Sequence, residues 1–455
     1  MGRWAVWGAL ACGALLPLGA PVAAQSQDPP AGTVLRLDIS QSLRFHDNLG
    51  LDPTTLGSTL RADTGLSLSF ESETRTQSFA MILGGTFRAE DAPITGNSTD
   101  FVNPNAALSY TQEGAQARFS FDGSFAQSDL DGLLAVFDPD LGTPSLVSDN
   151  GTRSQYSLAS RLDLGLSGPL GLRLEAQSRG TFYEDTLDPD LFDRRTHSGA
   201  VTATLGFSPV TEGTVRLSFT RYEAEDAART ERDTLELSFG IAHDLASGAV
   251  LEASLGGRHI DDSVTGERSA GEGRLRWSQE RPDGEISAEF SSRLTTAGQV
   301  DRLSVERRLA FPNWVITGSL GVVNVGGITT EPVFALAYST TFWRGEIGAS
   351  FSSDVNISSQ TEVSRVLQGS VSYNYLVGQA SLLRFGLSVT DVQDAGSTGV
   401  AEVRRGSVDI SFQHELARDW TLTAGVSWRM REEAGTRAHD NAVFVTLDRG
   451  LIFSR

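Results

Sequence analysis

The sequence predicts an all-β protein whose mature part is a single large antiparallel transmembrane β-barrel, with about 22 strands (roughly 18 or 20 as alternatives) and no plug domain. Three observations predict this fold. They are an export signal at the N-terminus, long segments in which apolar and polar residues alternate, and connections that are alternately long and short.

The N-terminus has the three parts of a secretory signal peptide. Arg3 precedes an apolar run from Trp4 to Leu18, and Val22-Ala23-Ala24 before Gln25 has the form of a cleavage site. We therefore expect residues 1–24 to be removed on export.

The remaining chain is predicted to be a short periplasmic segment over residues 25–32 and a barrel over residues 33–455. Cleavage removes Cys12, the only cysteine, so the mature chain has no thiol for a disulfide or a thiolate metal site. The net charge of -20 is opposite to that of a nucleic-acid-binding surface. No second long apolar segment follows that could form a transmembrane helix.

Alternation with period two fills the chain. Leu35, Leu37 and Ile39 alternate with polar residues near its start, and Leu235 and Leu237 do so near its middle. Such segments are strands with one apolar and one polar face. About ten to thirteen residues at about 3.3 Å each, tilted by roughly 40°, span the apolar band of an outer membrane.

The connections alternate between two lengths. Outer-membrane barrels have short periplasmic turns and longer outer loops, and their strand number is even. Tight turns are predicted at Glu113-Gly114, Ser247-Gly248 and residues 281–284, among others. The predicted long connections are residues 46–57, 90–100, 129–151, 184–195, 225–229, 262–270, 354–362, 391–399 and 432–440.

Charged residues on the polar face are candidates to line the lumen, because charges are costly in hydrocarbon. They either select solutes in a polar passage or brace adjacent strands as opposite charges, and both interpretations stay open. The pore-lining candidates are Arg36, Arg61, Arg118, Asp122, Arg161, Asp163, Arg173, Glu175, Arg274, Arg276, Glu289, Arg405 and Asp409.

Aromatic residues gather beside the short turns, which is typical of a periplasmic girdle at headgroup level. The girdle candidates are Tyr110, Trp314, Phe342, Trp343, Tyr373, Tyr375 and Trp420.

The longest connection, residues 129–151, contains the apolar run Leu133-Leu134-Ala135-Val136-Phe137. It either folds inward and constricts the lumen or stands outside as an outer loop. The acidic tripeptides Asp138-Pro139-Asp140 and Asp188-Pro189-Asp190 form either an acidic rim at the lipopolysaccharide surface or a calcium site. The acidic rim is favoured, because neither tripeptide belongs to a complete calcium-loop pattern with a closing Glu.

No enzymatic motif is present. The chain has no G-x-S-x-G, no H-E-x-x-H and no phosphate-binding glycine loop, and its six histidines are scattered singly. We predict no catalytic residue, no metal site and no cofactor.

Both ends of the barrel resemble known motifs. Leu43-Arg44-Phe45-His46-Asp47-Asn48-Leu49 resembles the first hairpin of β-barrel porins associated with exopolysaccharide systems. The stretch from Ala442 to Phe453 resembles the C-terminal strand that the outer-membrane assembly machinery recognises, although Ser454-Arg455 follow the terminal aromatic.

The porin resemblance implies passage or export of a carbohydrate or another small hydrophilic solute across the bacterial outer membrane. The alternative is a non-conducting structural or adhesive barrel that acts through its outer loops. The expected partners are outer-membrane lipid and lipopolysaccharide, the assembly machinery and the solute, and no nucleic acid.

Overall fold

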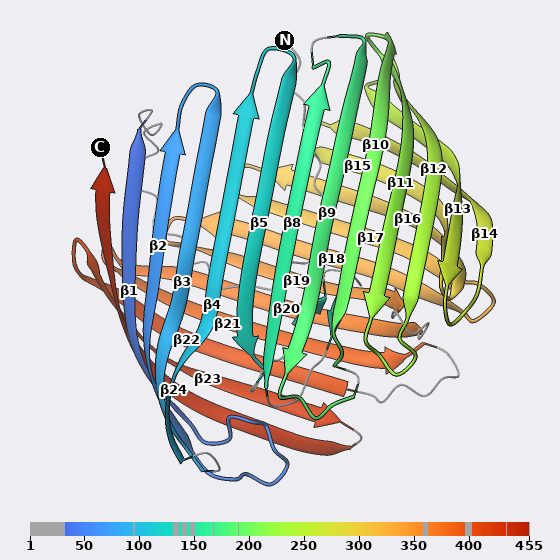
Figure 1. The fold of residues 1–455 in the computed structure, drawn as a ribbon. Helices are drawn as coiled ribbons and strands as arrows, with labels where there is room; N and C mark the ends of the chain where they lie inside the picture. Colours follow the sequence, from blue (N-terminus) through green and yellow to red (C-terminus); the bar gives the residue numbers. More distant parts are fainter. Residues whose placement is uncertain are drawn as a thin grey trace.

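The protein forms a closed β-barrel (Figure 1). The structure is a computed structural model that describes residues 32–93, 96–130, 136–138, 143–145, 151–166, 168–189, 191–357, 363–395, 403–433 and 435–454. Over these residues, 22 strands form one antiparallel sheet, and each strand pairs with the next along the chain. The predicted signal peptide and nearly all of the predicted periplasmic segment lie outside the described residues. Within the described ranges, no helix is long and apolar enough to cross a membrane.

The first half of the sheet contains β1 (Thr33–His46), β2 (Thr59–Glu73), β3 (Gln77–Ala92), β4 (Gly96–Glu113), β5 (Ala117–Asp129), β8 (Thr152–Leu164), β9 (Leu170–Glu184), β10 (Arg194–Ser208), β11 (Thr211–Ala224), β12 (Glu231–Asp244) and β13 (Ala249–Asp262). The second half contains β14 (Arg268–Arg281), β15 (Gly284–Thr295), β16 (Gly298–Phe311), β17 (Trp314–Val325), β18 (Thr329–Phe342), β19 (Gly345–Ile357), β20 (Val363–Gly378), β21 (Ser381–Asp394), β22 (Val403–Ala417), β23 (Trp420–Glu433) and β24 (Thr436–Ser454). A separate two-stranded sheet of β6 (Val136–Asp138) and β7 (Thr143–Ser145) lies in the connection between β5 and β8.

The first and last strands close the cylinder. β1 pairs with β24 from Val34 opposite Ser454 to His46 opposite Ala442. Both described chain ends therefore lie at the rim with the short turns, which we call the periplasmic rim. The rim with the long connections is called the outer rim.

The short turns have the expected local chemistry. At the predicted turn between β12 and β13, Gly248 has a φ of 79° and donates its amide hydrogen to the Leu245 carbonyl oxygen at 2.9 Å. Glycine adopts this left-handed conformation without the steric cost of a Cβ. The chain therefore reverses within a few residues and starts β13 at Ala249.

Strands extend further into two predicted outer connections than expected. β3 and β4 leave only residues 93–95 between them, and β23 and β24 leave only residues 434–435. Charged residues in these segments continue the ladder. For example, Arg437 of β24 lies 2.8 Å from Glu432 of β23. The predicted loop over residues 432–440 is therefore a strand hairpin.

The register gives the barrel an apolar outer face and a polar inner face. Leu217, Leu237 and Gly257 are opposite one another on β11, β12 and β13, and Leu237 is exposed. The predicted girdle lies on this outer face: Phe342 stacks on Tyr373 with ring centroids 6.2 Å apart, and Tyr373 stacks on Tyr375. These rings lie beside short turns, as an interfacial girdle requires.

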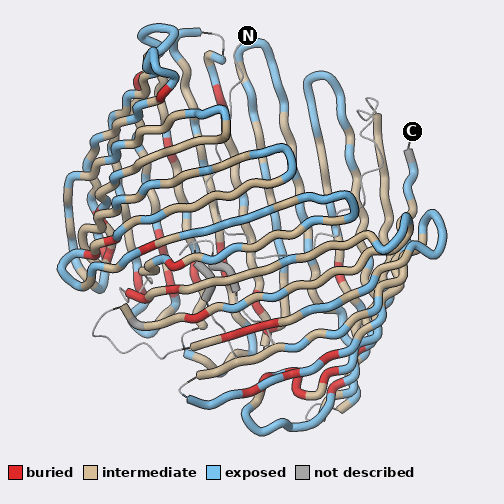
Figure 2. The backbone as a smooth tube through the Cα atoms, turned by 180° about the vertical axis from the view of Figure 1, so that it is seen from behind, coloured by how far each residue is buried: buried red, intermediate tan, exposed pale blue. Residues whose placement is uncertain are grey.

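Burial is concentrated toward the outer rim (Figure 2). Among the described residues, nearly all buried ones lie in the outer halves of strands or in outer connections, and the exceptions include Asp163, Gly213 and Ala249. A bare cylinder would bury little at either rim. The outer end of this barrel is therefore packed with side chains.

Candidate functional site: the charged lumen

The register places all thirteen predicted pore-lining residues on the inner face. They lie on β1, β2, β5, β8, β9, β14, β15 and β22, each two residues from other polar side chains. Whether any of them contacts a solute stays a prediction.

Part of the predicted set forms a compact ion-pair group on β8 and β9. Arg161 Nε lies 2.7 Å from Asp163 Oδ2, and Arg173 Nε lies 2.8 Å from Asp163 Oδ1. Nearby, Arg216 of β11 reaches across β10 to Glu175 of β9, with its Nη1 2.8 Å from Oε2. Asp163 is buried while the arginines remain partly exposed to the lumen.

A second set of pairs runs along β12 to β15. Arg258 lies between Glu236 and Glu272, at 2.5 Å and 2.6 Å respectively. On the next hairpin, Arg274 Nη2 lies 2.7 Å from Glu289 Oε2. Positive and negative charges thus alternate around the wall, as expected for opposite charges on neighbouring strands.

The other predicted residues stand apart from these groups. Arg36 pairs with Asp38 of its own strand at 2.7 Å. Asp122 accepts a hydrogen bond from the Ser109 hydroxyl at 2.8 Å. Arg405 is buried near the outer rim. The remaining members are Arg61 paired with Glu90, Arg118 paired with Glu113, Arg276 near Glu285, and Asp409.

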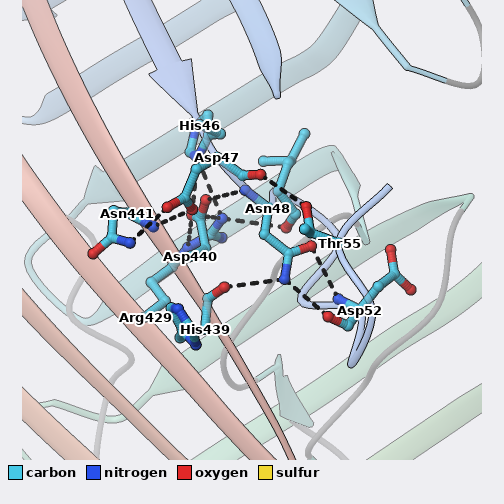
Figure 3. Close-up of polar contacts among 10 residues, drawn as sticks. His46, Asp47, Asn48, Asp52, Thr55, Arg429, His439, Asp440 and Asn441 are labelled. Atoms are coloured by element: carbon cyan, nitrogen blue, oxygen red, sulfur yellow. Dashed lines mark hydrogen bonds and ion pairs between the residues drawn. The ribbon is translucent and has the colours of Figure 1, made fainter. Parts of the chain in front are cut away.

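A buried polar cluster fastens the closing seam at the outer rim (Figure 3). The Asp440 side chain is 0% exposed. Its carboxylate lies 2.9 Å from His46 Nδ1 and accepts a hydrogen bond from Arg429 Nε at 3.0 Å. It also accepts one from the backbone amide of Asn48 at 3.1 Å. One carboxylate therefore ties β23 and β24 to β1 and to the connection that follows β1.

The same cluster holds the start of the β1–β2 connection. Asn48 Nδ2 donates to the backbone carbonyls of Asp52 and His439, at 2.9 Å and 3.0 Å. Asp47 accepts hydrogen bonds from the backbone amide and side-chain amide of Asn441, at 2.7 Å and 2.6 Å. The Asp47-Asn48 pair and the start of the C-terminal motif thus meet at the seam.

An unpredicted feature lies at the outer ends of β19 and β20. The ladder between β18 and β19 ends where Phe334 is opposite Ser353, so the last residues of β19 leave β18. Val355, Ile357 and Val363 then pack against Val323, Val325 and Val333, which lie on the inner faces of β17 and β18. We call residues 354–357 and 363–366, with Ala395, the inward corner.

Strand parity confirms the direction of this turn. Val355 lies on the same face of β19 as Phe351, which is exposed on the outside of the barrel. The same face of β19 is therefore outside the barrel at Phe351 and packed on the inner wall at Val355. This is possible only if β19 turns into the lumen between these two residues. Two ion pairs agree. Arg302 of β16 lies 3.1 Å from Asp354, and Arg365 lies 4.0 Å from Glu331 of β18.

The predicted constriction by residues 129–151 falls largely outside the described residues, as does most of the acidic tripeptide at residues 138–140. At the base of this connection, Leu130 is fully buried against Tyr183 and Leu191. Tyr183 is opposite Arg153 on the inner faces of β9 and β8. The described start of the connection therefore packs on the lumen side.

Sequence reasoning missed the corner and the seam. Arg365, by its parity, belongs to the lipid face, and no local pattern indicates that it meets Glu331. His46 and Asp440 are 394 residues apart, so only pairing of the two terminal strands brings them together.

A barrel of this size with an apolar outer face and a charged lumen is a bacterial outer-membrane β-barrel. Solved structures of an iron transporter and of two siderophore receptors share this fold. The solved FrpB iron transporter from Neisseria meningitidis is similar, with a TM-score of 0.60 and 9% identity over 92% of this chain and 82% of that chain. A mutant of the ferric enterobactin receptor PfeA from Pseudomonas aeruginosa, in complex with enterobactin, has a TM-score of 0.57 and 10% identity over 92% and 82%. The siderophore receptor PirA from the same organism has a TM-score of 0.54 and 12% identity over 92% and 80%.

No protein-family model and no curated protein matches the sequence. At these identities the likeness establishes the fold. The prediction that this chain is not an enzyme stays a prediction, because likeness at these identities carries no information on activity.

The predicted fold class was wrong in one respect, the exclusion of a plug domain. The solved barrels named above are an iron transporter and siderophore receptors, and 22-stranded outer-membrane transporters have a plugged lumen. The physical reason is width, because a cylinder of this many strands leaves a bore that side chains of the wall do not fill. The number of residues before β1 does not determine what occupies that bore.

The resemblance to exopolysaccharide-associated porins is not supported by these comparisons. The two motifs that carried it form the pairing strands of the seam, β1 and β24. Any closed barrel needs such a pair, so these motifs indicate a barrel and not a particular solute.

Proposed function

We propose that the barrel carries a hydrophilic solute across the bacterial outer membrane through its charged lumen. The observation that carries this proposal is the inner wall of half-exposed ion pairs. In the pair of Arg274 with Glu289, the side chains keep 49% and 31% of their surface accessible. Charges that remain accessible on an inner wall face water or a polar solute, because placing each of them in hydrocarbon would cost about 2–4 kcal/mol.

The receptors that share the fold supply a candidate for the solute class. These proteins are an iron transporter, a siderophore receptor and a ferric enterobactin receptor. We propose an iron chelate as the first candidate solute. A small uncharged carbohydrate, which a passive pore would pass, is the second candidate, favoured by the polar wall alone.

Uptake by whole cells separates the two candidates. Cells with and without the full chain would be given radiolabelled ferric siderophores under iron limitation. In parallel, liposomes containing the purified protein would be tested for swelling in isotonic sugars. Siderophore uptake that depends on the chain supports a receptor, and swelling supports a passive pore. If the chain supports neither siderophore uptake nor swelling, the transport proposal is overturned and a structural or adhesive barrel is favoured.

A further inference from the structure

We propose that the inward corner of β19 and β20 sets the size limit for solutes at the outer mouth of the lumen. This inference rests on the proposed transport function and names the element that limits it. Three observations support it: where the corner packs, how it is held, and where the barrel is filled.

The corner occupies space that the bore would otherwise have. Its apolar side chains cover the inner faces of β17 and β18, where Val325 is 0% exposed and Val323 and Val333 are each 4% exposed. On β8 and β14, by contrast, polar side chains such as Arg161 and Arg274 stay partly exposed to the lumen. The wall at this place is therefore two strand layers thick, and the open cross-section is reduced by the thickness of one layer.

The corner is held by apolar packing with ion pairs at its margins. Val363 is 3% exposed within the cluster, whereas Arg302 and Asp354 keep 42% and 51% of their side-chain surface. Exposed ion pairs contribute little to stability. The valine cluster is therefore the main attachment, and a charge within it should detach the corner from the wall.

The distribution of burial agrees with a constriction at this end. Buried residues gather at the outer rim, while the periplasmic ends of the strands hold few (Figure 2). A solute that enters from outside therefore meets the corner in the most crowded part of the described lumen.

The test compares Val363, which the corner buries against the inner wall, with Val315, which lies on the inner face of β17. Val363→Asp places a charge in the cluster, and Val315→Asp places the same charge on the inner face of β17 near the periplasmic rim, away from the cluster. Purified protein in liposomes would be tested for swelling in uncharged mono-, di-, tri- and tetrasaccharides. We expect Val363→Asp to admit larger sugars several-fold faster than the parent, and Val315→Asp to keep the parent's size limit.

A labelling experiment reports detachment without relying on transport. Ile357→Cys should react slowly with a hydrophilic maleimide in the parent and quickly when Val363→Asp is also present. The only native cysteine, Cys12, lies in the predicted signal peptide, so the mature background is clean. Fast labelling with an unchanged size limit would overturn the proposal and leave the proposed transport standing. A barrel that passes no sugar in either form, with or without detachment, would overturn sugar passage and the size limit together.

A reversible cross-link covers the case in which Val363→Asp fails to assemble. Arg302→Cys with Asp354→Cys, joined by a short reducible thiol cross-linker, should keep the corner against the wall. Reduction of the linker should then raise the rate for the largest sugar that still enters. An identical rate before and after reduction would contradict the proposal.

Discussion

Asp440→Asn tests the seam at the outer rim. The substitution removes the charge of a carboxylate that is 0% exposed, lies 2.9 Å from His46 Nδ1 and accepts hydrogen bonds from Arg429 and the Asn48 amide. Arg429, whose side chain is 14% exposed, would then lose its ion pair with Asp440. Breaking a buried pair in this way costs about 3–5 kcal/mol. We therefore expect the folded, heat-modifiable band on semi-native gels to unfold at a clearly lower temperature or denaturant concentration.

Arg437→Ala is the matched control. Arg437 pairs with Glu432 in the same hairpin of β23 and β24, at a similar distance of 2.8 Å, but its side chain is 64% exposed. An exposed pair contributes about 0–1 kcal/mol, so this variant should unfold nearly as the parent does. An equal loss of stability in both variants would mean that burial does not distinguish the seam pair from a surface pair.

Two further predictions test the wall and the topology. Leu237→Arg places a charge on the lipid face and should cost about 2–4 kcal/mol, with loss of the folded band. Ser238→Arg, one residue along on the inner face, should assemble. Equal tolerance of the two substitutions would mean that the assigned faces are wrong. A cysteine at Val264, in the β13–β14 connection, should react with an impermeant maleimide on intact cells. A cysteine at Ser247, in the β12–β13 turn, should not react. The reverse result would mean that the barrel has the opposite orientation in the membrane.

The strands and their faces could be predicted because both depend on local pattern. Alternation assigns each residue to a face without knowledge of its partners, and the register then keeps Leu217 opposite Leu237 and Arg173 opposite Asp163. The boundaries at residues 432–440 could not be predicted in the same way. Charged residues there resemble a loop, and only the cross-strand contact of Arg437 with Glu432 shows that the ladder continues.

The inward corner could not be predicted because it breaks the rule that alternation supplies. Val363 has the parity of the lipid face, and it is buried on the inner wall only because the end of β19 leaves β18. That departure depends on valines of β17 that lie about 40 residues earlier in the chain, a separation over which no period-two pattern carries information. The same limit hid the partners of Asp440.

The wall pairs allow the two interpretations of the lumen charges to be separated. Arg274 and Glu289 are half-exposed and 2.7 Å apart, so their pairing should contribute about 0–1 kcal/mol, measured as the coupling in a double-mutant cycle with Arg274→Ser and Glu289→Ser. Arg274→Ser also leaves one uncompensated carboxylate on the inner wall. If the wall selects solutes by charge, this variant should shift the permeability ratio toward cations, read from the reversal potential in a salt gradient. Arg437→Ser makes the same change in net charge on the outward face of β24, outside the lumen, and should leave the ratio unchanged. Equal reversal potentials for the parent and both variants, together with a measurable coupling energy, would mean that the charges brace the wall and do not select what passes.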